Sequence, residues 1–156
     1  MKVLAILSQK GGVGKTTLAT CLAVAAQRDG KQAAVFDLDP QATASFWNDT
    51  REAETPAVVS IQSVRLPAML KAAEEAGTDL AIIDGAAIAR DITFEAAKSA
   101  DFVLIPTRSA VFDTMSMLHT IELVRHQNKP FSVVLTFTTP AGHETEDAID
   151  AAKQIG

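Results

Sequence analysis

Residues Ser8 to Thr17, which read Ser-Gln-Lys-Gly-Gly-Val-Gly-Lys-Thr-Thr, constrain the fold more than any other part of the sequence. They follow an apolar run and open a helical pattern. Gly11, Gly12 and Gly14 lack the Cβ atoms that would keep a ligand off the backbone, so consecutive N–H groups can surround phosphate oxygens. The positive end of the following helix attracts the same anion. This stretch is therefore predicted to be a phosphate-binding loop, or P-loop.

The side chains of this loop extend the prediction to a nucleotide with Mg²⁺. Lys15 is placed to reach the β- and γ-phosphates, and the Thr16 hydroxyl is placed to bind Mg²⁺. Thr17 can add a hydroxyl or an N–H toward the α-phosphate. A glycine-rich turn without a ligand would explain the glycines but not two lysines and two threonines at these offsets. The expected nucleotide-binding residues are Gly11, Gly12, Val13, Gly14, Lys15, Thr16 and Thr17.

Apolar runs and helical patterns alternate along the whole chain of 156 residues. The alternation predicts an α/β fold with a doubly wound, mainly parallel sheet, right-handed crossovers and helices on both faces. The length suits a single domain, 1–156. Strands are expected at 2–7, 32–36, 58–61, 80–84, 102–105 and 131–136, and the clearest helices at 16–28, 42–51, 92–100 and 147–155.

Acidic residues stand at the ends of two later strands. Asp37 and Asp39 come directly after one apolar run, and Asp84 ends another, in the form of a Walker B element. The carboxyl ends of parallel strands share one edge of the sheet, where the first strand also delivers the P-loop. We expect Asp84 to hold Mg²⁺ through a water molecule. Asp37 and Asp39 are expected to point toward the same edge. The alternative is that these two residues only form a polar turn that caps the next helix.

The P-loop departs from the usual pattern at its beginning. Gln9 stands where the usual motif has glycine, five residues before Gly14, and Lys10 is an additional lysine. The string from Lys10 to Thr17 resembles the deviant Walker A motif of the ParA/MinD family of ATPases, which position plasmids, chromosomes and division machinery. The resemblance is to the small plasmid-partition type. It implies a P-loop NTPase fold that binds ATP or ADP with Mg²⁺.

The resemblance also implies residue roles. The extra lysine of the family reaches across a dimer interface to the partner's nucleotide, which assigns that role to Lys10. Asp39 corresponds to the residue that positions the attacking water, and Asp37 to one that supports the Mg²⁺ shell and the hydrogen bonds of its loop. The implied catalytic residues are Lys10, Lys15 and Asp39, and the implied metal site is Thr16, Asp37 and Asp84.

Two departures from the family pattern lie further along the chain. Members usually continue after the Walker B aspartate with a small residue and two prolines, whereas this chain has Gly85-Ala86-Ala87. The loss of two prolines is expected to loosen a segment that responds to the γ-phosphate. Members also usually continue past the equivalent of Gly156 with a strand and a helix that complete the adenine pocket. The resemblance thus implies a domain without these two elements.

The implied function is an ATP-dependent dimerising ATPase switch for partition or positioning of plasmid or chromosomal DNA. Its hydrolysis of ATP to ADP and phosphate is expected to be slow without a partner. The implied partners are a second copy in a nucleotide-dependent homodimer, a centromere-binding adaptor of ParB type, and non-specific DNA. Two alternatives stay open. One is a metabolic enzyme of the same superfamily that acts on a small carboxylate, and the other is a non-hydrolysing nucleotide-binding protein.

Composition limits the partners. The formal net charge of −5 gives no overall basic footprint, so contact with DNA must come from a local patch or from a partner. The single cysteine, Cys21, excludes a disulfide or a cysteine-ligated cluster within one chain, and we expect it to be buried in its helix. No apolar run is long enough to span a membrane, so neither membrane attachment nor secretion is expected. A bacterial cytoplasmic location is expected, with nucleoid association where DNA is bound.

Overall fold

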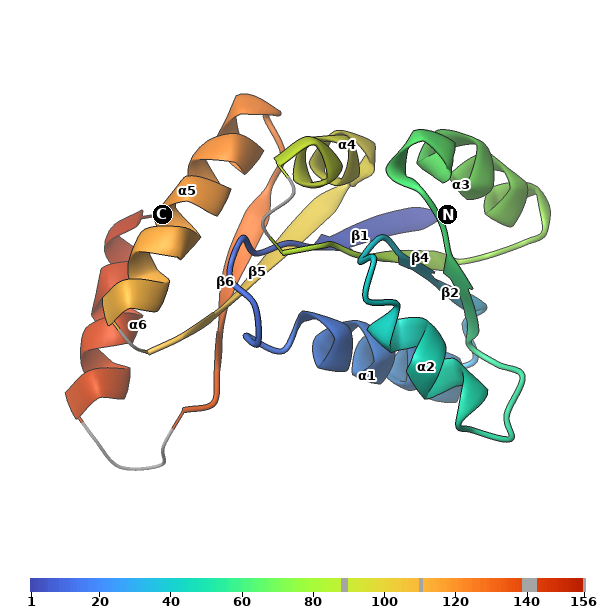
Figure 1. Ribbon diagram of the computed structural model, residues 1–156, viewed down its shortest axis with the longest axis horizontal. Coiled ribbons are helices and arrows are strands. Elements are labelled where there is room, and N and C mark those ends of the chain that lie inside the picture. The colour runs from blue at the N-terminus through green and yellow to red at the C-terminus, as the bar shows by residue number, and fades with distance from the viewer. Residues whose placement is uncertain (88–89, 110, 139–142, 156) are drawn as a thin grey trace.

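Six parallel strands form one sheet in the order β3-β2-β4-β1-β5-β6. The computed structural model describes residues 1–87, 90–109, 111–138 and 143–155 (Figure 1). Every neighbouring pair of these strands runs parallel, so the predicted parallel sheet is confirmed. The strands are β1 (Lys2–Ile6), β2 (Ala33–Asp37), β3 (Ala57–Ser60), β4 (Leu80–Asp84), β5 (Phe102–Arg108) and β6 (Phe131–Thr136).

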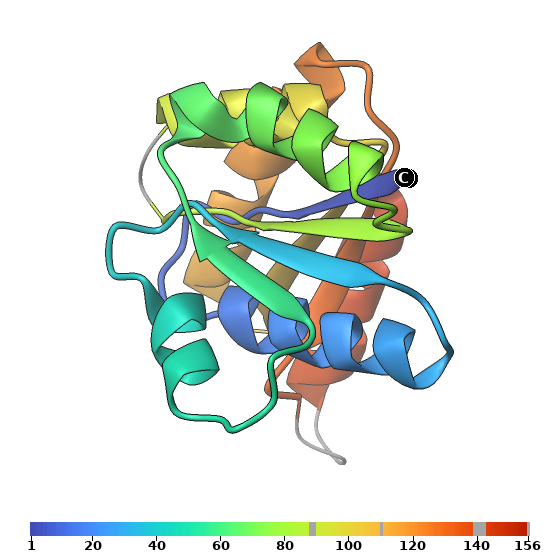
Figure 2. The same cartoon turned by 90° about the vertical axis from the view of Figure 1, so that its right-hand side faces the viewer.

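Helices cover both faces of the sheet, as the alternating pattern predicted. In Figures 1 and 2, α1 and α2 lie on one face and α3 and α4 on the other. Buried residues of α5 share the core of α3 and α4, and α6 lies against β6 (Figure 1). The helices are α1 (Lys15–Arg28), α2 (Thr43–Asp49), α3 (Leu66–Glu75), α4 (Arg90–Ser99), α5 (Val111–His126) and α6 (His143–Ile155), with a short 3₁₀ helix, η1, at Ser63–Arg65.

Strand β1 shows why the sequence of a central strand is continuously apolar. Successive side chains of a strand point to opposite faces, and here both faces are covered. Ala5 and Leu7 pack into the core below α3, α4 and α5. Ile6 packs into the opposite core with Ala19 and Ala23 of α1. Because β1 is central, the loop that follows it emerges in the middle of the sheet edge.

The sheet register places the acidic strand ends beside this loop. Asp37 at the end of β2 pairs in register with Asp84 at the end of β4. Asp84 in turn pairs with Ile6 of β1. Three neighbouring strands therefore finish at the same level, and two of them carry a carboxylate there. This confirms the sequence-based expectation that the P-loop and these acidic residues meet at one edge.

Strand β5 is longer than the sequence indicated. The prediction ended it at residue 105, but the strand continues through Pro106 to Arg108. Val103 donates its N–H to Pro130 of the β6 side at 3.0 Å, so the nitrogen of Pro106, three residues on, points to the opposite side. There β1 pairs with β5 only as far as Leu104. The missing N–H of proline therefore interrupts no ladder.

One expectation about α1 was wrong. Cys21 is exposed rather than buried. Ala19 and Ala23 are the residues of α1 that face the sheet and are fully buried. A residue two positions from each of them lies on the far side of the helix, because each residue turns the helix by about 100°.

None of the helices in the described part of the chain combines the length and apolar character needed to cross a bilayer.

Candidate functional site

The P-loop connects β1 to α1, and two of its glycines adopt conformations that other residues rarely take. Gly12 has φ 70° and Gly14, the residue before α1, has φ 88°, both in the left-handed region. Gly11 lies outside that region, and a Cβ built there would meet no atom within 4 Å. The backbone at Gly11 is thus open to approach from outside. These features fit a loop that wraps an anion.

Lys15 is held inside the loop. Its side chain is almost fully buried, and its Nζ donates a hydrogen bond to the carbonyl oxygen of Lys10 at 3.1 Å. Burial lowers the pKa of Lys15, while the carboxylates of Asp84 and Asp39 oppose that shift. The ammonium group therefore stands close to both carboxylates. It is poised to exchange a carbonyl partner for a more strongly charged one.

Asp84 is a buried carboxylate without the partners that a buried charge requires. Only 1% of the residue is exposed, and neither Oδ1 nor Oδ2 accepts a hydrogen bond of ordinary geometry from the described residues. Burial raises the pKa of Asp84 from 3.8 to about 7, although the nearby Thr16 hydroxyl and Lys15 favour the charged form. A buried carboxylate in this state requires an additional cation or donor.

Mg²⁺ fits these residues. This ion commonly takes one or two carboxylates and a hydroxyl from the protein and completes its octahedron with phosphate oxygens and water. Asp84 and Thr16 supply such a pair of groups at the start of α1. No group of three or more histidine, cysteine or acidic side chains suited to a metal occurs within the described ranges.

Asp37 has a different environment, although it is also buried. Its Oδ1 accepts the N–H of Asp39 at 3.0 Å, and its Oδ2 accepts the N–H groups of Ala44 and Ser45 at 3.0 and 3.2 Å. The last two belong to the first turn of α2, so Asp37 satisfies the free end of that helix. The expected hydrogen bonding of its loop is present. Its part in the Mg²⁺ shell stays a prediction.

Asp39 lies in the loop after β2, half exposed. Its Oδ1 accepts the N–H of Gln41 at 2.9 Å, and its carbonyl accepts that of Ala42 at 2.8 Å. Its charge raises the pKa of Asp84 and opposes the lowering of the pKa of Lys15, so it faces the same space as both. This location suits a group that orients a water molecule, a role that stays a prediction.

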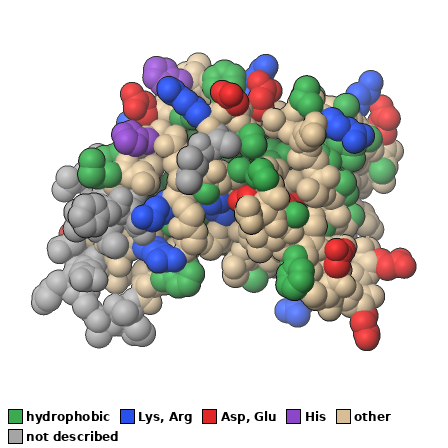
Figure 3. Space-filling model, viewed as in Figure 1, with side chains coloured by type: hydrophobic (Ala, Val, Ile, Leu, Met, Phe, Trp, Pro, Cys, Tyr) green, Lys and Arg blue, Asp and Glu red, His purple; other side chains and the backbone are tan. Residues whose placement is uncertain are grey.

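Lys10 stands at the outer side of the loop. Its N–H is bonded to the Ser8 hydroxyl at 3.3 Å, and its side chain is exposed. Thr17 is exposed as well. Basic side chains gather over this part of the molecule (Figure 3). The structure therefore places Lys15, Thr16 and the three aspartates together and leaves Lys10 facing outward.

Two residues at the ends of later strands also support the loop, and the sequence analysis did not place them in the site. Thr136 at the end of β6 directs its hydroxyl to the carbonyls of Val13 at 2.9 Å and Thr107 at 3.1 Å. Arg108 at the end of β5 donates to the carbonyl of Gly12, and its guanidinium lies 4.7 Å from the ring centre of Phe137. Polar residues at the carboxyl ends of β5 and β6 are the signal that could have found them.

The chain matches a known protein family over almost its whole length. A family model described as the CobQ/CobB/MinD/ParA nucleotide binding domain matches residues 4–156. Protein ParA of Rhizobium radiobacter is 26% identical over an alignment that covers 90% of this chain and 67% of the relative. Protein virC1 of Rhizobium rhizogenes is 30% identical over an alignment that covers 93% of this chain and 68% of the relative.

Solved structures share the fold at lower identity. An aspartate-to-alanine variant of McdA from Cyanothece in complex with ATP superposes with a TM-score of 0.81 at 22% identity, over 100% of this chain and 79% of that one. Cobyrinic acid a,c-diamide synthase from Mycobacterium smegmatis with bound ADP and magnesium gives 0.75 at 20% identity, over 99% and 82%. The predicted P-loop NTPase fold is confirmed by these likenesses.

Proposed function

The chain belongs to the CobQ/CobB/MinD/ParA nucleotide-binding family, as its P-loop predicted, and on that premise we propose that it is an ATP-dependent, dimerising ATPase switch. Its task would be partition or positioning of plasmid or chromosomal DNA. The proposal rests chiefly on the buried carboxylate of Asp84, which lies beside Lys15 and Thr16 and accepts no hydrogen bond of ordinary geometry from the described residues. The names of the relatives, ParA among them, support the choice of task.

Binding of ATP would use the loop as it stands. The N–H groups from Gly11 to Thr17 surround the phosphates, and Lys15 leaves the carbonyl of Lys10 to reach the β- and γ-phosphates. Thr16 and Asp84 would hold Mg²⁺, and the bound ion would supply positive charge beside the phosphates. The buried Asp84 carboxylate is stabilised in its charged form by that cation. Nucleotide and metal are thus expected to bind together.

Hydrolysis would depend on positioning. Asp39, in the loop after β2, orients a water molecule toward the γ-phosphate, while Lys15 and the loop N–H groups stabilise the charge of the transition state. Lys10 faces outward from the same loop. In a dimer it would complete the partner's site, so that ATP favours the dimer and hydrolysis releases it. An adaptor of ParB type would accelerate the step.

DNA would be reached through a local patch. The formal net charge of −5 does not favour a general attraction to nucleic acid. A dimer that presents two copies of one basic patch would bind DNA more strongly than a monomer does. This arrangement would tie DNA binding to ATP, and with it we propose a location in the bacterial cytoplasm and on the nucleoid.

The metabolic alternative finds less support in the site. A pocket of about 570 Å³ adjoins Asp39, between the ends of β2 and β3 and the beginning of α4. The described residues that line it include no lysine, arginine or histidine. A small carboxylate substrate would require such a cation. Turnover of ATP by the purified protein would in turn dismiss the non-hydrolysing alternative.

Replacement of the outward-facing lysine tests the proposal. Lys10→Gln should abolish dimer formation with a non-hydrolysable ATP analogue, because the partner's phosphates lose a cation, while ADP binding stays within about twofold of wild type. Sedimentation velocity and titration calorimetry measure the two properties. Lys31→Gln, at an exposed position beyond the end of α1, is the matched control. A Lys10→Gln protein that still dimerises with the analogue would rule out this role.

A further inference from the structure

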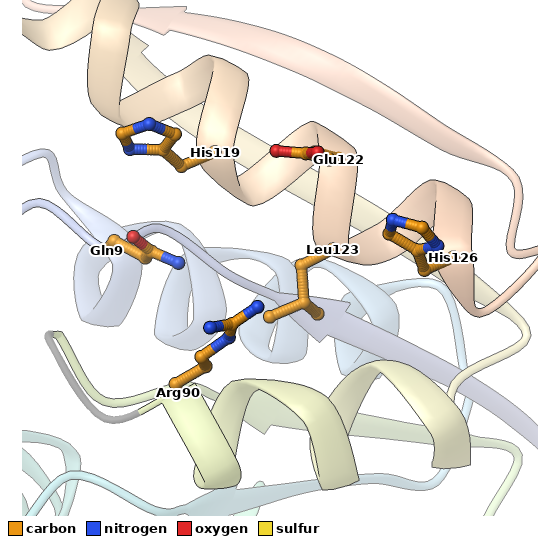
Figure 4. A pocket seen from close by; sticks show the side chains of 6 residues that line it. All are labelled: Gln9, Arg90, His119, Glu122, Leu123 and His126. Carbon is orange, nitrogen blue, oxygen red and sulfur yellow. The ribbon is translucent and has the colours of Figure 1, made fainter.

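A pocket lined in part by Gln9, at the beginning of the P-loop, lies outside the nucleotide site described above. It has a volume of about 320 Å³ and lies between the beginning of α4 and the outer face of α5 (Figure 4). Histidine, basic and acidic side chains gather on this part of the surface (Figure 3). The lining residues are Gln9, Arg90, His119, Glu122, Leu123 and His126.

The pocket holds opposite charges on opposite walls. Arg90 reaches from α4 toward α5, and Glu122 belongs to the α5 wall (Figure 4). Both side chains are exposed, and no ion pair within 4.0 Å joins either of them to another part of the described chain. A binding partner that presents a negative group to Arg90 and a positive group to Glu122 would pair with both side chains. Two copies of the same pocket, related by a two-fold axis, provide that arrangement.

Apolar side chains extend the surface along α5. Met115 and Leu118 are 61% and 44% exposed. Their spacing from Glu122 puts all three on one stripe of the helix, because residues separated by three, four or seven positions share a face. The opposite face of α5 is buried through Met117 and Ile121. Exposed apolar groups beside complementary charges are typical of a surface that becomes covered in an assembly.

The pocket is joined to the P-loop. Gln9, which lines it, directly precedes Lys10, and its backbone N–H donates to the Thr120 hydroxyl of α5 at 3.3 Å. Thr120 is fully buried and donates in turn to the carbonyl of Ser116 at 3.0 Å. A shift of the loop on binding phosphates would therefore change one wall of the pocket. Contact made there can depend on the bound nucleotide.

We propose that this surface, the pocket together with Met115 and Leu118, docks against the same surface of a second copy, with Arg90 of each subunit paired to Glu122 of the other. The proposal rests on the proposed nucleotide-dependent dimer and adds to it the residues that select the partner. Each dimer then contains two such ion pairs around the two-fold axis. The adjoining Lys10 is carried toward the partner's nucleotide by the same contact.

Charge exchange tests this pairing. Arg90→Glu and Glu122→Arg are each sedimented with Mg²⁺ and a non-hydrolysable ATP analogue, alone and then as an equimolar mixture. Each variant alone should dimerise at least about tenfold more weakly than wild type, because both pairs become repulsive. The mixture should recover dimers, because in the mixed dimer both pairs are attractive again. Lys98→Glu, an exposed reversal on α4, is the control and should dimerise as wild type does.

The outcomes separate this proposal from the one on which it rests. Wild-type protein that stays monomeric with the analogue would overturn the switch and this pairing together. Wild-type dimers with both variants unaffected would overturn the pairing alone. Weakened variants whose mixture recovers no dimer, although each still binds the analogue with wild-type affinity, would also overturn it. Recovery in the mixture is the result that the proposal requires.

Discussion

Asp84 shows how one residue links the stability of the empty protein to its ligand. Its carboxylate is buried at the end of β4, and burial is the main reason that its pKa rises from 3.8 to about 7. An acid with a raised pKa in the folded state binds a proton more tightly there than in the unfolded chain. Stability therefore falls as the pH rises between these two values. The pKa of Asp37 is raised as well, with the same sign.

The pH dependence of unfolding tests this account of Asp84. Without Mg²⁺ or nucleotide, the free energy of unfolding should fall by up to a few kcal/mol between about pH 4 and about pH 7. Asp84→Asn keeps the shape of the side chain but cannot ionise, so its slope over this window should be clearly smaller. Urea unfolding at a series of pH values measures both. Equal slopes for the two proteins would contradict the raised pKa.

Thr136 offers a test of how the P-loop is supported. Its hydroxyl lies within hydrogen-bonding distance of Val13 and Thr107. Thr136→Val should weaken ADP binding by about fivefold, because the single hydroxyl proton, which the two carbonyl oxygens share, contributes about 1 kcal/mol to the order of the loop. Titration calorimetry measures the affinity. The exposed Thr138, two residues on, gives the control Thr138→Val. Unchanged affinity in Thr136→Val would mean that the loop holds its shape without this support.

Some residues of the candidate site could be predicted from the sequence, and others could not. The P-loop could be recognised because its glycines, lysines and threonines are contiguous. Asp84 could be placed because it ends an apolar strand. Thr136 and Arg108 could not be placed in the same way, since they contact the loop from 123 and 96 positions away. Contacts of this kind arise from the strand order and register, which no local pattern contains.

Among the elements, α2 depends on a residue that lies outside it. Asp37, the last residue of β2, accepts the N–H groups of Ala44 and Ser45 in the first turn of the helix. The residue before the helix, Ala42, has φ 51° and makes no side-chain cap. The helix thus begins where the strand end provides an acceptor. This acceptor accounts for the start of α2 at Thr43; the helix ends at Asp49, two residues before the end of the predicted range 42–51.

Loss of that acceptor should destabilise the fold. Asp37→Asn replaces one accepting oxygen by an amide group, so at least one buried backbone N–H loses its partner. We expect a loss of about 1–3 kcal/mol in the free energy of unfolding. Urea unfolding at neutral pH measures the change, with Asp49→Asn at the exposed end of α2 as the control. A variant as stable as wild type would show that water replaces the carboxylate.

Strand positions were predicted within a few residues because buried parallel strands are continuously apolar. The exception is β5, where the usual effect of proline suggested an end at residue 105. The strand continues because Pro106 points its nitrogen to a side on which β1 has ended. The consequence is functional, since the added residues bring Arg108 to the P-loop. Whether a proline ends a strand therefore depends on whether a neighbouring strand pairs with the side to which its nitrogen points.

At the scale of the whole molecule, the candidate nucleotide site and the proposed dimer surface adjoin the same loop. The P-loop emerges at the middle of the sheet edge, with carboxylates at the ends of two neighbouring strands beside it. Its outward lysine and the mixed-charge pocket on α4 and α5 both adjoin the same loop. Nucleotide state and association can be coupled over this short path. The parallel sheet with helices on both faces was predictable from the sequence, whereas the strand order and the pocket required the structure.

Sedimentation velocity of the purified protein with Mg²⁺ and a non-hydrolysable ATP analogue, against ADP as control, tests whether the γ-phosphate drives dimerisation. We expect a dimer with the analogue and a monomer with ADP. The two nucleotides differ in the γ-phosphate, so the comparison isolates the group that the switch must sense. A monomer in both conditions, with nucleotide binding confirmed in the same samples, would contradict the claim.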